Sequence, residues 1–106
     1  MLSLKDLSYL AALDEFRHFG KAAAACYVSQ PTLSGQLKKL EHQLGVQLLE
    51  RGSNTVIFTY VGWEIVQRAK TMVLQAREME ELARASIAPL NGRLKLAIIP
   101  SLAPYL

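Results

Sequence analysis

Residues 30–42 carry polar side chains of the kinds that recognise DNA bases, spaced so that they share one face of a helix. On a wheel of 100° per residue, leucines fill one side of this segment. The opposite side, called the polar face below, holds Pro31, Ser34, Gly35, Lys38 and His42, with Thr32 and Lys39 at its edges and Gln30 at its N-terminal tip. Glutamine can pair with adenine, lysine can reach guanine or phosphate, hydroxyls suit either, and a threonine methyl group or proline ring can touch a thymine methyl group. We therefore predict base-reading roles for Gln30, Pro31, Thr32, Ser34 and Lys38.

The same spacing is also typical of an ordinary amphipathic helix whose polar side faces solvent. The distribution of charge favours an anionic partner. Residues 17–51 hold five basic residues and two acids, and this difference of three equals the net charge of +3 of the whole chain. Positive charge gathered around the polar face is what attraction to the phosphate backbone of DNA requires.

Other kinds of site lack the residues they need. Ser29 and Ser34 have no recognisable His–Asp partners for nucleophilic catalysis, and there is no phosphate-binding glycine loop. His18 and His42 have no carboxylate or cysteine at metal-ligand spacing, and the single cysteine, Cys26, can form no internal disulfide. We expect no enzymatic activity, no catalytic residue, no metal site and no cofactor.

The segments around the polar face predict a helix-turn-helix. Ser3 can cap a first helix with a broad apolar face. Residues 21–27 are rich in alanine and predict a short second helix. Ser29 can cap a third helix, which carries the polar face and ends at Gly45. Two helices joined by about three residues, the second with a bare polar face, are typical of this motif.

After Gly45 the pattern changes to that of strands. Residues 46–51 and 56–59 are predicted to be two short strands, and residues 52–55 the turn between them. So small a hairpin must pack on the helices. The expected fold class is mainly α, a winged helix-turn-helix of three helices and a two-stranded wing that occupies residues 1–59.

A long linker helix is predicted over residues 60–88, with Thr59 as its cap. Its apolar residues alternate spacings of four and three, which is typical of a heptad seam. At 1.5 Å per residue the helix would be roughly 40 Å long, more than so small a domain can cover. We therefore favour a seam that pairs two copies over one that packs on its own domain. The predicted dimer interface consists of Ile65, Ala69, Met72, Val73, Ala76, Met79 and Ala83.

The last residues, 89–106, are expected to be a hinge followed by the first strand of a further domain that is missing. Residues 93–99 alternate into an apolar strand, which has no partner within the chain.

Residues 28–41 and 44–51 resemble the N-terminal signature of LysR-type transcriptional regulators. The resemblance extends over about residues 4–88, and it is specific because helix, turn, wing and linker helix come in the family's order. Residues 30–36 and 99–106 are similar to the hydrogen-peroxide-sensing, OxyR-like branch of that family.

The resemblance implies a homodimeric bacterial regulator, an activator or a repressor, that binds double-stranded DNA at a partly palindromic operator. It implies pairing through the linker helix, a tetramer in a full-length protein, and RNA polymerase as a further candidate partner. No apolar run is long enough to cross a bilayer, so we expect a cytoplasmic location at the nucleoid. The predicted phosphate contacts are His18, Ser29, Lys39, Arg51, Thr55 and Thr59.

Two alternatives remain open at this point. The chain could belong to a LysR-type regulator that responds to another small effector. It could also be an adaptor whose winged helix binds a protein, with an incidental basic face.

Overall fold

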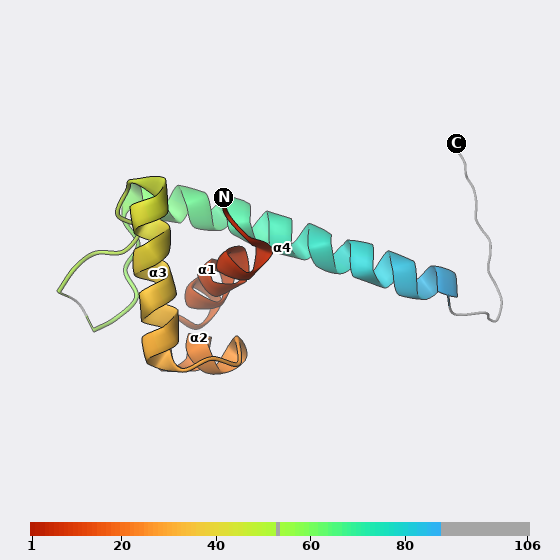
Figure 1. Ribbon diagram of the computed structural model, residues 1–106, viewed down its shortest axis with the longest axis horizontal. Coiled ribbons are helices and arrows are strands. Elements are labelled where there is room, and N and C mark those ends of the chain that lie inside the picture. Colours follow the sequence, from red (N-terminus) through yellow and green to blue (C-terminus); the bar gives the residue numbers. More distant parts are fainter. Residues whose placement is uncertain (53, 88–106) are drawn as a thin grey trace. The chain divides into compact units, whose positions relative to one another are not determined.

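The computed structural model describes residues 1–52 and 54–87 and is mainly helical (Figure 1). The chain divides into two compact units, residues 1–75 and the residues from 76 onward. The predicted hinge and strand of residues 89–106 lie outside the described residues. None of the described helices combines the length and apolar character needed to cross a membrane. The helices are α1 Leu4–Phe16, α2 Phe19–Ala25, α3 Gln30–Leu44 and α4 Tyr60–Ile87.

Helix α1 begins with the predicted cap. The Ser3 hydroxyl accepts a hydrogen bond from the Asp6 N–H, and the Asp6 carboxylate accepts one from the Ser3 N–H, both at 3.1 Å. This reciprocal pair satisfies two backbone donors that the first turn of a helix leaves free. The helix ends at Arg17, whose φ of 50° is left-handed.

Helix α2 begins two residues before the predicted start at residue 21, because an imidazole caps it. The Lys21 N–H donates to Nδ1 of His18 at 3.0 Å. The helix also ends before residue 27, where Tyr27 takes a left-handed φ of 60°. Histidine is an uncommon cap, so the residue types alone predicted a start of α2 that is two residues too late.

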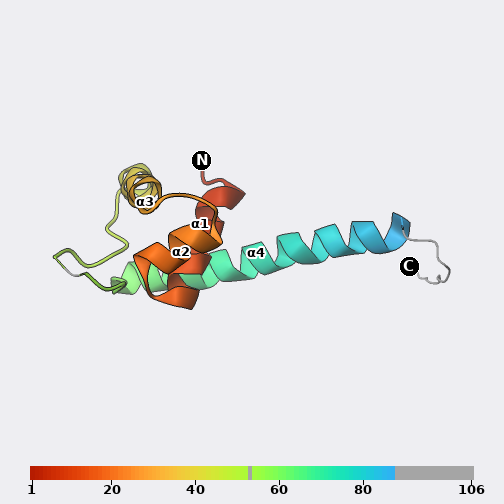
Figure 2. The ribbon, with the colours of Figure 1, turned by 90° about the horizontal axis from the view of Figure 1, so that it is seen from below.

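Helix α3 confirms the predicted bounds and the leucine stripe. Ser29 caps its first turn, and Gly45 ends it with a φ of 74°, a conformation that favours glycine. Leu33, Leu37 and Leu40 are buried against the other helices. In Figure 2, α1 and α2 lie against each other and α3 is seen almost along its axis.

The prediction of two strands, 46–51 and 56–59, is wrong for the described residues. The segment 46–59, called the wing below, contains a single isolated antiparallel bridge between Leu49 and Phe58. Residue 53 of the predicted turn lies outside the described residues.

The bridge is not extended into a ladder because neighbouring backbone groups have other partners. The N–H groups of Leu48 and Leu49 donate to the Glu41 carboxylate at 2.7 and 3.2 Å. The Thr59 carbonyl accepts from the Trp63 N–H in the first turn of α4. At the Leu48–Thr59 end of the bridge, a side-chain partner and a helix partner thus replace the second cross-strand bond that a longer hairpin would need.

The first part of α4 completes the core of residues 1–75. The Thr59 hydroxyl accepts from the Gly62 N–H at 3.0 Å, as expected of a cap. Val66, Ala69 and Val73 are buried in the core. In the second unit, the described residues 76–87 are the C-terminal part of α4, and all of their side chains except that of Ala76 are exposed.

Candidate nucleic-acid interface

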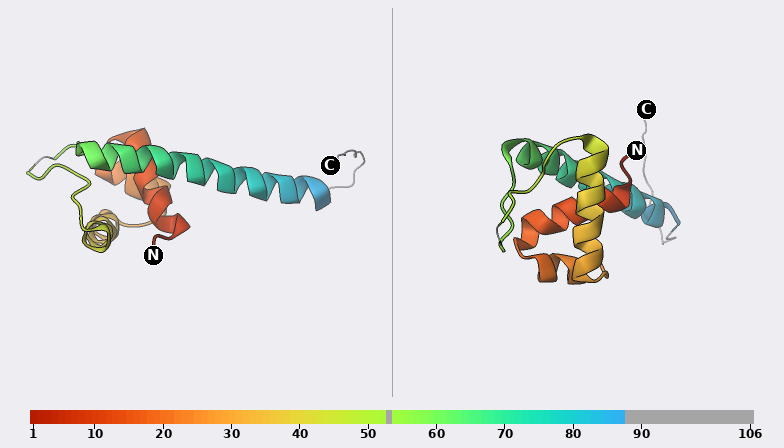
Figure 3. Two further views of the ribbon diagram at one scale, coloured as in Figure 1. Left: turned by 90° about the horizontal axis from the view of Figure 1, so that it is seen from above. Right: turned by 60° about the vertical axis from the view of Figure 1, so that its left-hand side comes forward.

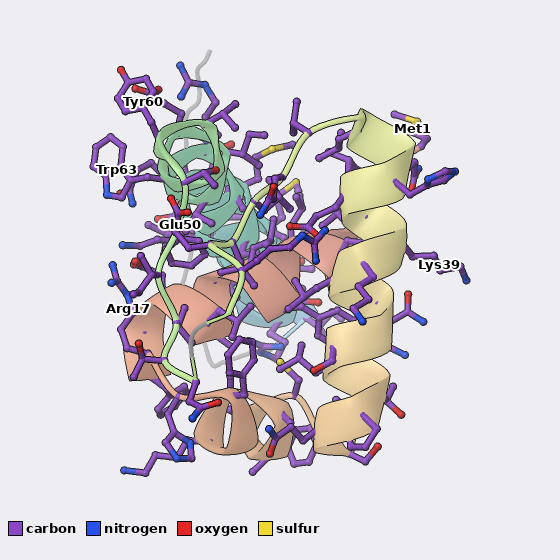
Figure 4. All side chains as sticks on the ribbon, turned by 90° about the vertical axis from the view of Figure 1, so that its left-hand side faces the viewer. Met1, Arg17, Lys39, Glu50, Tyr60 and Trp63 are labelled. Carbon is purple, nitrogen blue, oxygen red and sulfur yellow. The ribbon has the colours of Figure 1, made fainter. Side chains whose placement is uncertain are left out.

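The polar face of α3 is not covered by the rest of the described chain. Its residues are exposed, except for Ser34, which is half-buried. Figure 3 (right) shows α3 on the outside of the first unit with α1 crossing behind it, and Figure 4 shows Lys39 pointing outward from the helix. The five predicted base-reading residues are therefore all accessible, at least in part, to an incoming ligand.

Two hydroxyl groups are coupled at the N-terminal end of α3. The Ser29 hydroxyl accepts from the Thr32 N–H at 3.2 Å and shares a hydrogen bond with the Thr32 hydroxyl at 2.9 Å. One of the two hydroxyl hydrogens lies between the side chains, and the other is left to point outward as a donor. The phosphate contact predicted for the Ser29 side chain stays a prediction, because either of the two hydroxyl groups can be the donor in this bond. The backbone N–H groups of the first turn can also bind a phosphate.

Gln30 lies beside the beginning of α2. A Cβ built on Gly20 would lie 3.1 Å from Cε1 of His18 and 3.5 Å from Oε1 of Gln30. His18 and Gln30 thus belong to one surface at this end of the motif. Because Nδ1 of His18 accepts the capping bond, a neutral ring carries its proton on Nε2. That N–H is the donor with which His18 could meet a phosphate.

Gly35 occupies the middle of the polar face and has open space in front of it. A Cβ built there would meet no atom within 4 Å. The fold therefore does not require glycine at this position, although glycine costs helix stability relative to other residues. Because glycine has no side chain, nothing projects from the helix surface between Ser34 and Lys38.

We expect Gly35→Leu to separate folding from binding. The free energy of unfolding should rise by about 0.5–1 kcal/mol, because leucine favours helix over glycine. Affinity for duplex DNA should fall at least about tenfold, since the bulk would hold the helix away from the base edges. Thermal unfolding and a DNA titration measure the two effects, and the exposed Gln43→Leu change on the same helix is the control. A stabilised variant that binds DNA as well as the wild type would contradict the interpretation of Gly35.

An open groove of about 440 Å³ lies between α3 and the wing. A smaller cavity of about 140 Å³ shares several of its residues, including Lys38 and Arg51. The Arg51 guanidinium is exposed and lies 3.9 Å from the Glu41 carboxylate, so the pair is loose. Basic side chains thus border the groove from both α3 and the wing. Its lining residues are Lys38, Glu41, His42, Gly45, Val46, Gln47 and Arg51.

Two residues that position the site were not singled out from the sequence. Glu41 ties α3 to the wing through its bonds to two backbone N–H groups. Gly62 allows the α4 backbone to approach the wing, since a Cβ there would overlap the Leu48 carbonyl. A glycine in the first turn of a predicted helix is a signal of close packing that could have identified Gly62. The sequence carries no comparable signal for Glu41.

Thr59 has a structural role where a phosphate contact was predicted. Its hydroxyl donates to the Gln47 carbonyl at 2.6 Å and accepts from the Gly62 N–H. Its hydrogen is thus used inside the protein in this structure, while the phosphate contact predicted for Thr59 stays a prediction. Thr55 lies in the exposed part of the wing.

The residues of the predicted dimer interface fall into a buried group and an accessible group. Ala69 and Val73 are only 1% and 6% exposed and belong to the chain's own core, so they are unavailable to a second copy. Met72 and Met79 are 53% and 67% exposed. Among the other predicted interface residues, Ile65 and Ala76 are half-buried and Ala83 is exposed.

Known proteins share this arrangement. A model of the family "Bacterial regulatory helix-turn-helix protein, lysR family" matches residues 4–63. The hydrogen peroxide-inducible genes activator of Pectobacterium carotovorum subsp. carotovorum is 47% identical over 105 residues, which are 99% of this chain and 35% of that protein. The chain therefore spans about one third of this relative's length.

Two solved structures are also similar to this chain over most of its length. A variant of full-length OxyR from Pseudomonas aeruginosa superposes with a TM-score of 0.74 at 46% identity, over 78% of this chain and 28% of that one. The BenM DBD in complex with benA site 1 DNA has a TM-score of 0.74 at 36% identity, over 82% of this chain and 98% of that one.

Proposed function

The chain belongs to the LysR family of bacterial helix-turn-helix regulators, and on that premise we propose that it binds specific double-stranded DNA as a homodimer. The observation that carries this proposal is the uncovered polar face of α3, whose opposite side is fixed in the core by leucines. A helix held in this way can enter the major groove without rearrangement of the domain.

The polar face supplies base recognition in this proposal. Gln30 and Thr32 lie at the N-terminal end of α3, the end of a recognition helix that contacts base edges. Lys38 lies where α3 meets the wing, so that it can reach a base or the adjoining phosphate. Pro31 and Ser34 complete the predicted base contacts. One similar structure solved with DNA, the BenM DBD, matches 82% of the present chain.

Phosphate attraction would come from Lys39 and Arg51, with His18 and Thr55 as further contacts. Among the described residues, Lys39 takes part in no ion pair. Its charge is therefore available to displace counterions from the DNA backbone.

Pairing of two copies would use the part of the seam that the core leaves accessible. Met72, Met79 and Ala83 are exposed, with Ile65 and Ala76 at the edge of the core. Two copies would place two recognition helices in successive major grooves of a partly palindromic site. In a longer protein we infer a tetramer, a cytoplasmic location at the nucleoid, and contact with RNA polymerase.

We infer from its relatives the signal to which the regulator responds. The similar protein of Pectobacterium carotovorum is a hydrogen peroxide-inducible genes activator, and a similar structure is an OxyR. We propose an OxyR-like regulator of the response to peroxide, acting as activator or repressor. The alternative is a LysR-type regulator that answers another small effector.

DNA selected by the chain from a random pool tests the proposed function. The selected sequences should contain two related half-sites about one helical turn apart, the spacing that a symmetric dimer requires. A single half-site would contradict the dimer. Failure to retard any duplex at low salt would contradict DNA binding and favour the protein-binding adaptor.

Replacement of Lys39 by alanine tests the phosphate contact separately. Affinity should fall to a similar extent for all sequences, and the slope of log K against log salt should decrease by about 1. A titration at several salt concentrations measures that slope. Arg77→Ala removes the same charge from an exposed position outside the predicted DNA contacts and should leave the slope unchanged. An unaltered slope for Lys39→Ala would show that this lysine contacts no phosphate.

A further inference from the structure

The Asp14 carboxylate, near the end of α1, binds two cations that come from different parts of the first unit. Its Oδ2 accepts from Lys70 Nζ of α4 at 2.7 Å, and its Oδ1 accepts from the Arg17 guanidinium at 2.9 Å. The Asp14 side chain is only 12% exposed. Both carboxylate oxygens are thus occupied, and the Asp14 side chain is largely covered, although the side chains of Arg17 and Lys70 are about half exposed.

The electrostatics of Asp14 favour its charged form. Burial by itself raises the pKa of this carboxyl group, but the hydrogen bonds from Lys70 and Arg17 outweigh that effect. The pKa therefore lies below its ordinary value of 3.8, and the carboxylate is ionised at neutral pH.

Arg17 connects this carboxylate to the wing. Besides the ion pair, its Nε donates to the Asp14 carbonyl at 3.2 Å. The guanidinium carbon lies 5.2 Å from the centre of the Phe58 ring, within the range of a cation–π contact. Figure 4 shows Arg17 on the side of the domain opposite Lys39.

Phe58 is the point at which the two halves of the wing meet. It forms the isolated bridge with Leu49. The Glu50 N–H donates to the Ile57 carbonyl at 2.8 Å on one side of that bridge, and the Thr59 N–H donates to the Leu48 carbonyl at 2.9 Å on the other. A hairpin with so few cross-strand bonds is marginal without outside support.

We propose that Asp14 is a positioning residue for DNA binding: it holds Arg17 against Phe58 and so fixes the base of the wing, and it binds Lys70 and so ties the first part of α4 to α1. The inference rests on the proposed function, because the position of the wing beside α3 matters to binding only if both reach the duplex. None of the predicted DNA contacts includes Asp14, Arg17 or Lys70.

Hydrogen exchange of the Asp14→Ala variant tests the structural half of this inference. The amides of Glu50 and Thr59 should exchange about three- to fivefold faster than in the wild type, the range expected for loss of one exposed cation–π contact. Amides in the middle of α3 should be unchanged. Uniform acceleration of all amides would mean general destabilisation and would overturn the proposal. Phe58→Leu, which removes the ring but keeps an apolar side chain, should act on the same two amides, and its effect should not add to that of Asp14→Ala.

A DNA titration of the same variants tests the functional half. Affinity of Asp14→Ala for the selected duplex should fall about three- to tenfold, in the range of effects transmitted through a neighbouring element. Glu64→Ala removes another carboxylate that pairs with an arginine, Arg68 at 2.8 Å, on the exposed side of α4. This control should change neither wing exchange nor affinity.

The outcomes separate the two proposals. If the wild type binds DNA and Asp14→Ala binds equally well, the role of Asp14 in DNA binding is wrong and the proposed function stands. Unchanged exchange at Glu50 and Thr59 would overturn the link to the wing. A wild type that binds no duplex would contradict the proposed function itself.

Discussion

Replacement of Gly62 by alanine is expected to lower the free energy of unfolding by about 3 kcal/mol or more, at the upper end for overpacking of a rigid interior. A Cβ at this position would lie 2.9 Å from the carbonyl carbon and 3.0 Å from the Cα of Leu48, and it would overlap the carbonyl oxygen. The obstacle is backbone, which cannot rotate away as a side chain can. That same carbonyl accepts from Thr59, so movement of the segment would also disturb the wing.

Urea unfolding followed by circular dichroism measures this loss. Gly35→Ala is the matched control, because it makes the same chemical change at a helical position with open space around it. The control should be more stable than the wild type by about 0.5–1 kcal/mol. If both variants were stabilised alike, the close approach of α4 to the wing would not exist in solution.

Replacement of Gln30 by alanine is expected to remove about 1–3 kcal/mol of discrimination at one base pair, roughly a tenfold to hundredfold loss of selectivity. The amide of Gln30 lies at the N-terminal end of α3, next to His18 and Gly20. A glutamine there can form two hydrogen bonds with adenine, and alanine can form none. Affinity for duplexes that already lack the preferred base should change little.

Binding to a set of duplexes that differ at single positions measures the effect. Gln43→Ala is the control, because Gln43 is an exposed glutamine near the other end of the same helix and is not among the predicted DNA contacts. It should leave base preference unaltered. If Gln30→Ala kept the wild-type preference at every position, the assignment of Gln30 as a base-reading residue would be wrong.

The helices that carry the site could be predicted from the sequence because their signals are local. The Ser3 and Ser29 caps and the terminal Gly45 each act within a few residues of their own position. The buried leucines of α3 follow from the helical period alone. The orientation of the polar face then follows, since a helix that buries one side presents the other.

What could not be predicted depends on contacts between distant residues. The predicted strands of the wing do not pair at the Leu48–Thr59 end, because Glu41, seven residues earlier, binds the Leu48 N–H. Asp14 and Lys70 are 56 positions apart, and no pattern in the sequence pairs them.

The packing of α4 is a second feature that the sequence alone could not determine. The heptad spacing identifies an apolar side but does not say which surface covers it. Ala69 and Val73 face the chain's own core, while Met72 and Met79 remain exposed.

The open space in front of Gly35 has a consequence for protein engineering. Because a Cβ added there meets no neighbour, a library at this position of all amino acids except proline, which would break the helix, should fold without compensating changes. Under the proposed function, position 35 is thus a place where the base preference of α3 can be varied without loss of the fold, with each variant compared both in its affinity for DNA and in the base pairs it selects.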